Sequence, residues 1–149
     1  MSICMEAIGC VINNIDSPRD YGWAKVESRI IIREHLSPVL SGLSGFSHIL
    51  VIFWMHQAEP PTALKRSPQG RDDMPEVGLL AQRSKHRPNP IGVTAVQLIK
   101  VCGCELIVRG LDAINGTPVL DIKPYYSHYD RIDEIRMPEW VDRLMKDYF

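Results

Sequence analysis

The densest group of side chains that could do chemistry lies in residues 83–92, which read Arg-Ser-Lys-His-Arg-Pro-Asn-Pro-Ile-Gly. Three cations and one histidine stand within five positions, with no acid among them. Pro88 and Pro90 fix two φ angles and favour extended geometry at Arg87 and Asn89. Such a rigid loop loses little entropy on binding a ligand, arginine forks suit carboxylate or phosphate, and an asparagine amide suits an adenine edge. The alternative is a solvated basic turn stiffened by proline.

A second segment, residues 110–125, combines a turn with charged groups on one strand. Asn115-Gly116 indicates a tight turn, which could equally be a plain hairpin. Asp121 and Lys123 are two residues apart, so on a strand they share a face as a surface ion pair or as two poles of a polar site. Because Pro124 cannot donate to a sheet ladder, the strand should end there or run along an edge.

A third segment places polar groups directly after an apolar run. His56 and Gln57 follow Ile49–Met55, the longest apolar run in the chain. Polar side chains just beyond a buried strand suit the mouth of a barrel, although a histidine in this position is also commonly structural.

The elements that position these groups should be mainly strands. Apolar or alternating runs predict strands at residues 6–12, 25–32, 48–56, 77–82, 91–101, 105–110 and 118–125. The run at 48–56 predicts a central strand buried on both faces. Cys102-Gly103-Cys104 predicts a hairpin turn. About seven short strands favour an all-β barrel or sandwich.

Helical signals are few. Ser37-Pro38 resembles an N-cap followed by proline at the first helical position, which predicts one short helix before the central strand. Residues 138–148 predict an amphipathic C-terminal helix. Residues 59–76 show no period of 2 or 3.6 and predict a long loop of the functional or mobile kind.

Composition sets the class of protein. The 149 residues, with 45% hydrophobic and 23% charged residues, predict a single domain over residues 1–149. No basic residue precedes Arg19 and no apolar run is long enough to span a bilayer, so we expect a cytoplasmic protein without a membrane segment. A net charge of −1 restricts any nucleic-acid site to a local basic patch. No dinucleotide-binding or P-loop glycine motif is present.

The cysteines are expected to be reduced thiols that act as small buried hydrophobes. Their spacing differs from that of structural zinc sites, so we expect no metal. The four are Cys4, Cys10, Cys102 and Cys104.

Taken together, the three segments resemble the TsaA-like (TrmO-type) family of tRNA adenine-37 N6-methyltransferases. The strings Arg-Pro-Asn-Pro-Ile-Gly and Asp-Ile-Lys-Pro-Tyr are long and compositionally improbable, so the match is specific. The resemblance runs from about Ile8 to Tyr126. The matching residues are Gly45–His48, His56-Gln57, Arg83-Ser84, Arg87–Gly92 and Gly116–Tyr125.

The resemblance implies a small β-barrel that binds S-adenosyl-L-methionine and works as a homodimer. It implies methylation of N6 of N6-threonylcarbamoyladenosine at position 37, in the anticodon loop of tRNA. The turn Ser17–Trp23 would add a wall to the cofactor site. The implied cofactor-binding residues are His56, Gln57, Arg83, Arg87, Pro88, Asn89, Thr117, Pro118, Asp121, Pro124 and Tyr125.

For catalysis, we expect Asp121 or a neighbouring backbone carbonyl to accept the proton from N6, and Lys123 to contact a phosphate or the threonyl carboxylate. RNA would dock along one cationic side, with tyrosines available to stack on an unpaired base. The cations are Lys65, Arg66, Arg71 and Arg83–Arg87, and the tyrosines are Tyr125, Tyr126 and Tyr129. The alternatives are a methyltransferase of another substrate and a non-catalytic module that binds S-adenosylmethionine or a nucleotide.

Two departures from the family bear on the substrate. Many bacterial members continue into a further C-terminal domain; if that domain helps to hold tRNA, we expect this sequence to engage its substrate differently. Asn115 stands where the family often has an acid, which keeps the turn but removes a charge. The enzymatic interpretation depends on one expectation, that the arginine–proline loop and the tyrosine-ended segment 117–125 converge on one pocket.

Overall fold

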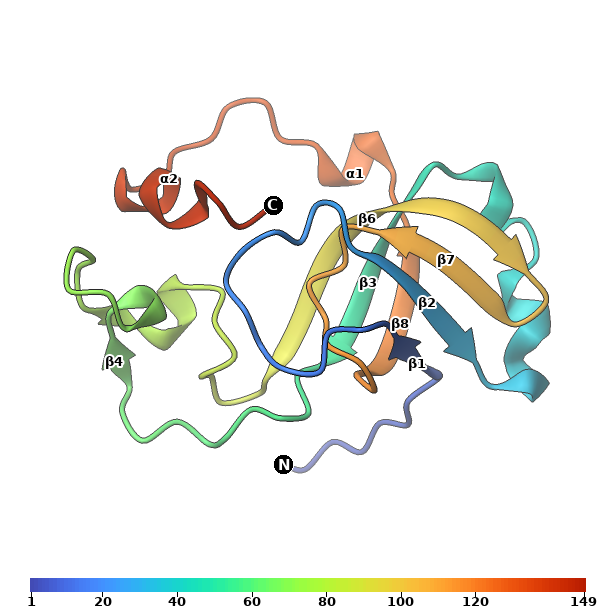
Figure 1. Cartoon of the computed structure of the whole chain (residues 1–149), viewed down its shortest axis with the longest axis horizontal. Helices are drawn as coiled ribbons and strands as arrows, with labels where there is room; N and C mark the ends of the chain where they lie inside the picture. Colours follow the sequence, from blue (N-terminus) through green and yellow to red (C-terminus); the bar gives the residue numbers. More distant parts are fainter.

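Six antiparallel strands close into a barrel in the order β1-β2-β7-β6-β3-β8, as the computed structural model of residues 1–149 shows (Figure 1). The mainly β fold and the barrel are therefore confirmed. The barrel strands are β1 Gly9–Ile12, β2 Glu27–Ile32, β3 His48–Trp54, β6 Ile91–Cys102, β7 Glu105–Arg109 and β8 Pro118–Pro124. A separate two-stranded sheet joins β4 Lys65–Arg66 to β5 Val77–Gly78.

The central strand β3 pairs with β6 on one side and with β8 on the other. Ile49, Val51 and Phe53 point into the barrel and are buried, whereas the alternate residues lie half-buried on the outside. The prediction that this strand is buried on both faces is wrong, because a barrel strand has only one interior face. The core is apolar and consists of Val11, Ile30, Ile32, Leu40, Ile49, Val51, Phe53, Val96, Leu98, Leu106, Val108, Leu111, Ala113 and Val119.

A β-bulge at Leu120 changes the face that β8 presents. Val119 pairs with Phe53 and Asp121 pairs with Ile52, so two residues that are two apart take opposite faces. Val119 is buried in the core, and Asp121 lies on the outside of the barrel. Bulges commonly re-aim a side chain in this way.

Gly92 allows a very close contact inside the barrel. A Cβ at this position would overlap the ring of Phe53, which faces it across the β3–β6 pair. We expect Gly92→Ala to lower the free energy of unfolding by about 1–3 kcal/mol, because the buried ring must shift. Gly45→Ala is the matched control, since a Cβ added at this position would have no atom within 4 Å. Urea unfolding measures both, and equal stability of the two variants would contradict the packing argument.

The helices differ from their prediction in type and length. The segment before β3 forms two 3-10 helices, η1 Glu34–Leu40 and η2 Leu43–Gly45, and the first begins ahead of Ser37 and carries Pro38 inside. Ser37 is not a cap, so the predicted start is wrong. Two further 3-10 helices are η3 Pro68–Gly70 and η4 Leu79–Ala81, and the first α-helix is α1 Ser127–Asp130.

The C-terminal helix α2 covers only Trp140–Met145, so the prediction of residues 138–148 is too long. Residues 146–148 form a turn after the helix, in which Tyr148 N donates to Met145 O at 3.2 Å. Asp147 O accepts from Gly22 N and Tyr148 O accepts from Trp23 N, each at 3.0 Å, so this turn is bonded to the loop that precedes β2. None of the helices has the length and apolar character to cross a membrane.

Three other local predictions have mixed outcomes. The turn at Cys102-Gly103-Cys104 is confirmed, with Gly103 at φ +60° between β6 and β7. The strand predicted at 77–82 is wrong, because it lasts only through Gly78 and lies outside the barrel. The cysteines are also not buried: Cys4 and Cys102 are exposed, and Cys10 and Cys104 are half-buried.

Candidate functional site

The C-terminal end of β3 brings two of the predicted segments together. Trp54 pairs with Ile91, and Met55 N donates to Pro90 O at 2.8 Å. His56 and Gln57 therefore leave the barrel beside the arginine–proline loop, and both side chains are exposed. We call this end of the barrel the mouth.

The start of β8 lies at the same mouth, because Val119 pairs with Phe53. The predicted tight turn at Asn115-Gly116 is confirmed, with Gly116 at φ +78°, but it does not connect two paired strands and is not a plain hairpin. It packs on the segment after β1 instead. Asn115 N donates to Ile15 O at 2.7 Å, and the Asn115 amide donates to Asp16 at 3.2 Å. Thr117, a predicted cofactor contact, is 2% exposed.

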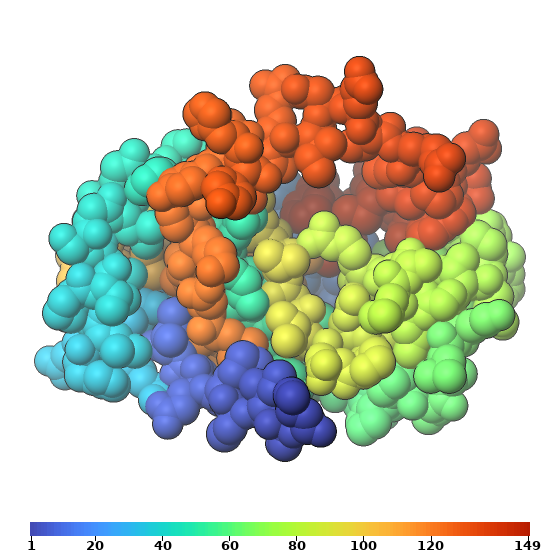
Figure 2. Space-filling view, turned by 180° about the vertical axis from the view of Figure 1, so that it is seen from behind, coloured from blue at the N-terminus to red at the C-terminus, as the bar shows by residue number.

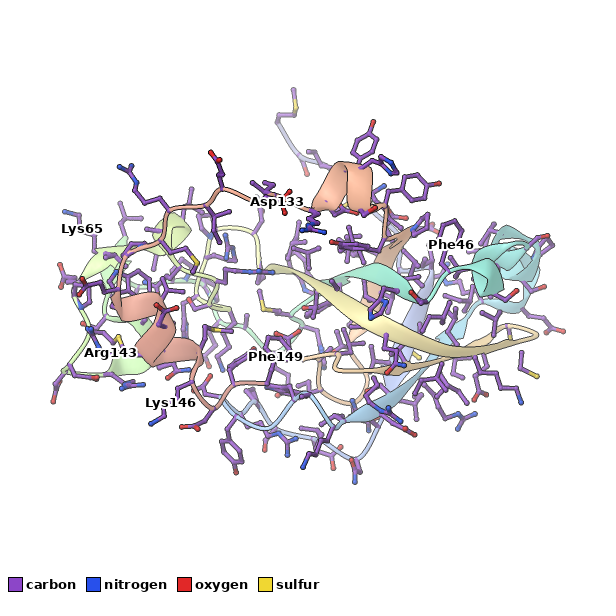
Figure 3. All side chains as sticks on the ribbon, turned by 90° about the horizontal axis from the view of Figure 1, so that it is seen from above. Phe46, Lys65, Asp133, Arg143, Lys146 and Phe149 are labelled. Carbon is purple, nitrogen blue, oxygen red and sulfur yellow. The ribbon has the colours of Figure 1, made fainter.

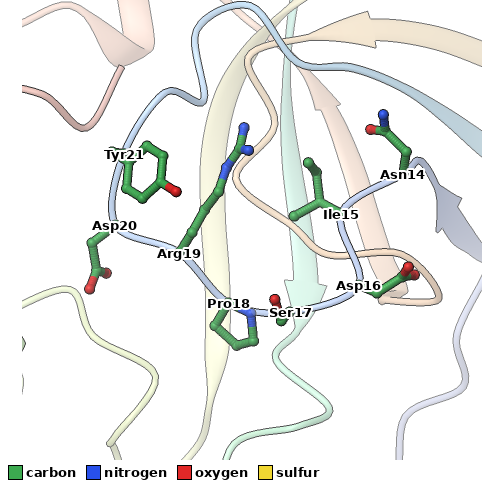
Figure 4. Close-up of a pocket in the computed structure, with 8 residues that line it drawn as sticks. All are labelled: Asn14, Ile15, Asp16, Ser17, Pro18, Arg19, Asp20 and Tyr21. Atoms are coloured by element: carbon green, nitrogen blue, oxygen red, sulfur yellow. The ribbon is translucent and has the colours of Figure 1, made fainter.

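Residues 14–21 surround an open pocket of about 520 Å³ beside the mouth (Figure 4). Arg19 extends inward from this loop. Its guanidinium lies 5.6 Å from the centre of the Tyr21 ring and 5.0 Å from that of Trp23, and Nη2 donates to Gly22 O at 3.0 Å. The Nε–H of Arg19 is buried without a partner. A buried donor without an acceptor is costly, so this side chain is suited to an anionic group entering the pocket.

The two arginines of the basic segment have different surroundings. Arg83 is exposed and donates through Nη2 to Val93 O on β6. Arg87 is half-buried and donates to Gln82 O at 3.2 Å and to Ser84 O at 3.5 Å. Arg87 therefore helps to fold its own loop, as in the alternative of a stiffened turn, and Arg83 stands at the edge of the mouth.

Asp121 and Lys123 form an ion pair on the outer face of β8, with Nζ and Oδ2 2.8 Å apart. The hydrogen bond from Lys123 and the charge of Asp121 raise the pKa of the lysine, so Lys123 is a cation at neutral pH. The other oxygen of Asp121 accepts from Ile122 N at 2.9 Å. The predicted sharing of one face is confirmed, and the pair is a surface ion pair in which the carboxylate is about half exposed.

Pro124 and Tyr125 lie at the opposite end of β8 from the mouth. Pro124 pairs with Ile49, and Tyr125 N donates to His48 O at 3.1 Å. His48 and Trp54 are six positions apart on β3, which corresponds to about 20 Å. We call this second end the far end. Within one chain, only the first residues of segment 117–125 lie at the same end of the barrel as the arginine–proline loop, with β3 between them.

The predicted RNA contacts also separate. Tyr126 lies 5.8 Å from Phe46 and 6.4 Å from Tyr129, ring centre to ring centre, and this cluster belongs to the far end. Figure 3 places Phe46 at one end of the molecule and Lys65 at the other. From behind, residues 60–90 form a lobe beside the C-terminal residues (Figure 2). In one chain the tyrosine cluster and these cations are therefore separated along the length of the molecule.

A buried contact beside the mouth was not apparent in the sequence. The Thr94 hydroxyl donates to one oxygen of Asp112, and the Tyr148 hydroxyl donates to the other at 2.7 Å. Burial and the charge of Asp112 raise the pKa of Tyr148, so the phenol stays protonated. The tail thereby closes the gap between loop 14–23 and β6. Asp112 and Tyr148 are far apart in the sequence, so no local pattern predicts this contact. No group of three or more His, Cys, Asp or Glu residues is arranged to hold a metal ion.

Comparison with known proteins gives consistent matches. The family model for the N-terminal domain of tRNA-methyltransferase O matches residues 10–131. A probable S-adenosyl-L-methionine-binding protein of Methanothermobacter thermautotrophicus is 41% identical over 117 residues, which are 78% of this chain and 82% of that protein. A human tRNA (adenine(37)-N6)-methyltransferase is 39% identical over 99 residues, which are 66% of this chain and 22% of that protein.

The solved structures agree with the sequence matches. The crystal structure of TrmO from Pseudomonas aeruginosa matches with a TM-score of 0.74 and 29% identity, over 91% of this chain and 61% of that one. The chain thus spans less than two thirds of the solved structures and about a fifth of the human protein. Since the family model covers the barrel from β1 to α1, the chain belongs to the TrmO N-terminal-domain (TsaA-like) family.

Proposed function

We propose that the protein binds S-adenosyl-L-methionine at the mouth and methylates N6 of N6-threonylcarbamoyladenosine at position 37 of tRNA. The observation that carries this proposal is the meeting of His56-Gln57, the arginine–proline loop and loop 14–21 at one end of a family barrel. The names of the relatives support both parts: one is a probable S-adenosyl-L-methionine-binding protein and another a tRNA (adenine(37)-N6)-methyltransferase.

The residues at the mouth fit such a cofactor. The unpartnered Nε–H of Arg19 and the exposed fork of Arg83 suit its carboxylate. The exposed amides of Gln57 and Asn89 suit the adenine edge, and the turn Ser17–Trp23 supplies the wall. When bound there, the sulfonium supplies an already activated methyl group.

The protein's task is then to position the acceptor and to remove a proton. Asp121 lies on the outer face of β8, beside Ile52 and one strand from Val93. In our proposal the Asp121 carboxylate takes the proton that N6 loses as the new C–N bond forms and the C–S bond breaks. The cationic Lys123 holds that carboxylate in place and faces the phosphate or threonyl carboxylate of the substrate.

A homodimer would complete the site that one chain leaves divided. The outer face of β3 and β6 between the mouth and the far end is largely apolar and partly exposed, with Val93 43% and Ile91 36% exposed. A two-fold axis through the middle of this face would set the far end of one copy against the mouth of its partner. Tyr125 of one copy would then reach the arginine–proline loop of the other. The apolar residues are Leu50, Ile52, Trp54, Ile91, Val93 and Ala95.

Calorimetry and methylation assays test the proposal together. We expect heat on titration with S-adenosylmethionine, and transfer of one methyl group to N6-threonylcarbamoyladenosine in tRNA, read by mass spectrometry of the nucleosides. Cofactor binding without methylation of any tRNA would favour a binding module, and methylation in a metabolite pool alone would favour another substrate. Absence of heat with the cofactor would overturn the proposal.

A further inference from the structure

The lobe of residues 60–90 holds basic side chains that form no ion pair with an acid. Arg66, Lys85, His86 and Arg87 are each half-buried. The six ion pairs of the protein all involve other residues. Partial burial of charge without a partner is unfavourable, so this cluster is suited to an anion from outside the chain.

Gln82 holds the two parts of the cluster together. Its side chain is 5% exposed, and its amide donates to Arg66 O at 3.0 Å. Arg87 donates to the backbone carbonyls of Gln82 and Ser84. These bonds fix residue 66 of β4 against residues 82–87, which are distant in sequence. The basic groups are therefore positioned before any ligand arrives, which lowers the entropic cost of binding.

Two buried polar atoms in the same place lack partners. The Oε1 atom of Gln82 and the hydroxyl of Ser84 are both buried without a hydrogen bond. Buried polar groups are nearly always paired, so such orphans indicate a missing ligand or water. The Ser84 hydroxyl can donate to an anion, and Gln82 Oε1 can accept from a water that the anion holds.

The protonation of His86 depends on its burial and on the charges around it. Burial lowers its pKa, and the nearby charges of Arg66 and Lys85 lower it further, while Glu59 alone opposes them. At neutral pH the imidazole is therefore neutral and limits the positive charge of the empty cluster. A bound anion would reverse this balance and favour protonation of His86.

We propose that Arg66, Ser84, Lys85 and His86 form a site for a backbone phosphate of RNA, whose affinity increases as His86 takes up a proton. This inference rests on the proposed function, because the tRNA substrate supplies the phosphate. Arg71, which belongs to the basic side expected from the sequence, is not part of this site. Its guanidinium donates to both oxygens of Asp73, at 2.8 and 2.7 Å.

Fluorescence anisotropy with a synthetic anticodon stem-loop RNA, between about pH 5 and pH 8 at fixed ionic strength, tests the site. For the unaltered protein we expect affinity to fall about tenfold as pH rises, which corresponds to a rise of one unit in the pKa of His86 on binding. His86→Gln should flatten this dependence, whereas the control His128→Gln should not.

Arginine variants give a second readout. Arg66→Ala should weaken binding at every pH and reduce the slope of log affinity against log salt by about 0.7, because one phosphate contact is lost. Arg71→Ala should change neither. Equal losses from Arg66→Ala and Arg71→Ala, or a pH dependence that His86→Gln leaves intact, would overturn the site.

The cofactor distinguishes failure of this inference from failure of the proposed function. Titration with S-adenosylmethionine does not involve Arg66, Ser84, Lys85 or His86, so normal calorimetry and methylation with pH-independent RNA binding would remove the phosphate site alone. If pyrophosphate raises the pKa of His86 in an NMR titration but the RNA does not bind, the assignment to RNA is overturned.

Discussion

Mixing two inactive variants, Asn89→Ala and Tyr125→Ala, should restore methylation to about one quarter of the unaltered activity. Each variant alone is expected to lose about 100-fold, because a cofactor or substrate displaced by a missing contact loses its reactive alignment. In a two-fold dimer with shared sites, a mixed dimer carries both changes in one site and none in the other. Random mixing makes half of the dimers mixed, and each contributes one intact site of two.

The structure motivates this experiment because Asn89 and Tyr125 lie at opposite ends of β3. Tyr125 N donates to His48 O, whereas Asn89 lies two residues before Ile91, which pairs with Trp54 at the other end of the strand. A matched control mixes Asn89→Ala with Gln57→Ala, both at the mouth, and should recover nothing. If mixed dimers form, as shown by two differently tagged copies, but activity stays absent, the site is not shared in this way.

The outline of the fold was predictable because its signals are local. The apolar runs that form β3 and β6, the glycine of the Cys-Gly-Cys turn and the Asn115-Gly116 turn each act over a few residues. The turn that follows the short C-terminal helix was not, since it is bonded to a loop distant in sequence, for example from Trp23 N to Tyr148 O. Local propensity has no access to such a partner.

The candidate site shows the same limit more sharply. The motif residues could be named from the sequence, but their division between two ends follows from the length of β8 and its pairing with β3. The bulge at Leu120 had no local signal either, and it decides that Asp121 faces outward. The half-buried cations around Gln82 required the contact between β4 and residues 82–87.

The outward position of Asp121 leads to the second large effect. In single-turnover assays at saturating cofactor, Asp121→Asn should slow methylation by about 100-fold or more, since a positioned general base contributes roughly that factor. Asparagine keeps an oxygen for Ile122 N–H and nearly the same shape, but it cannot take a proton from N6. Saturating cofactor removes any loss of cofactor binding from the measured rate.

Lys123→Met separates proton transfer from the loss of the ion pair. Both variants break the contact between Asp121 and Lys123, but only Asp121→Asn removes the base. Because both side chains are about half exposed, the ion pair itself should add little stability, and thermal unfolding of both variants should stay close to that of the unaltered protein. We expect Lys123→Met to weaken RNA binding while the single-turnover rate at saturating RNA falls much less. An unchanged rate in Asp121→Asn would instead mean that N6 loses its proton to water or to a backbone carbonyl, and that the barrel accelerates transfer by alignment alone.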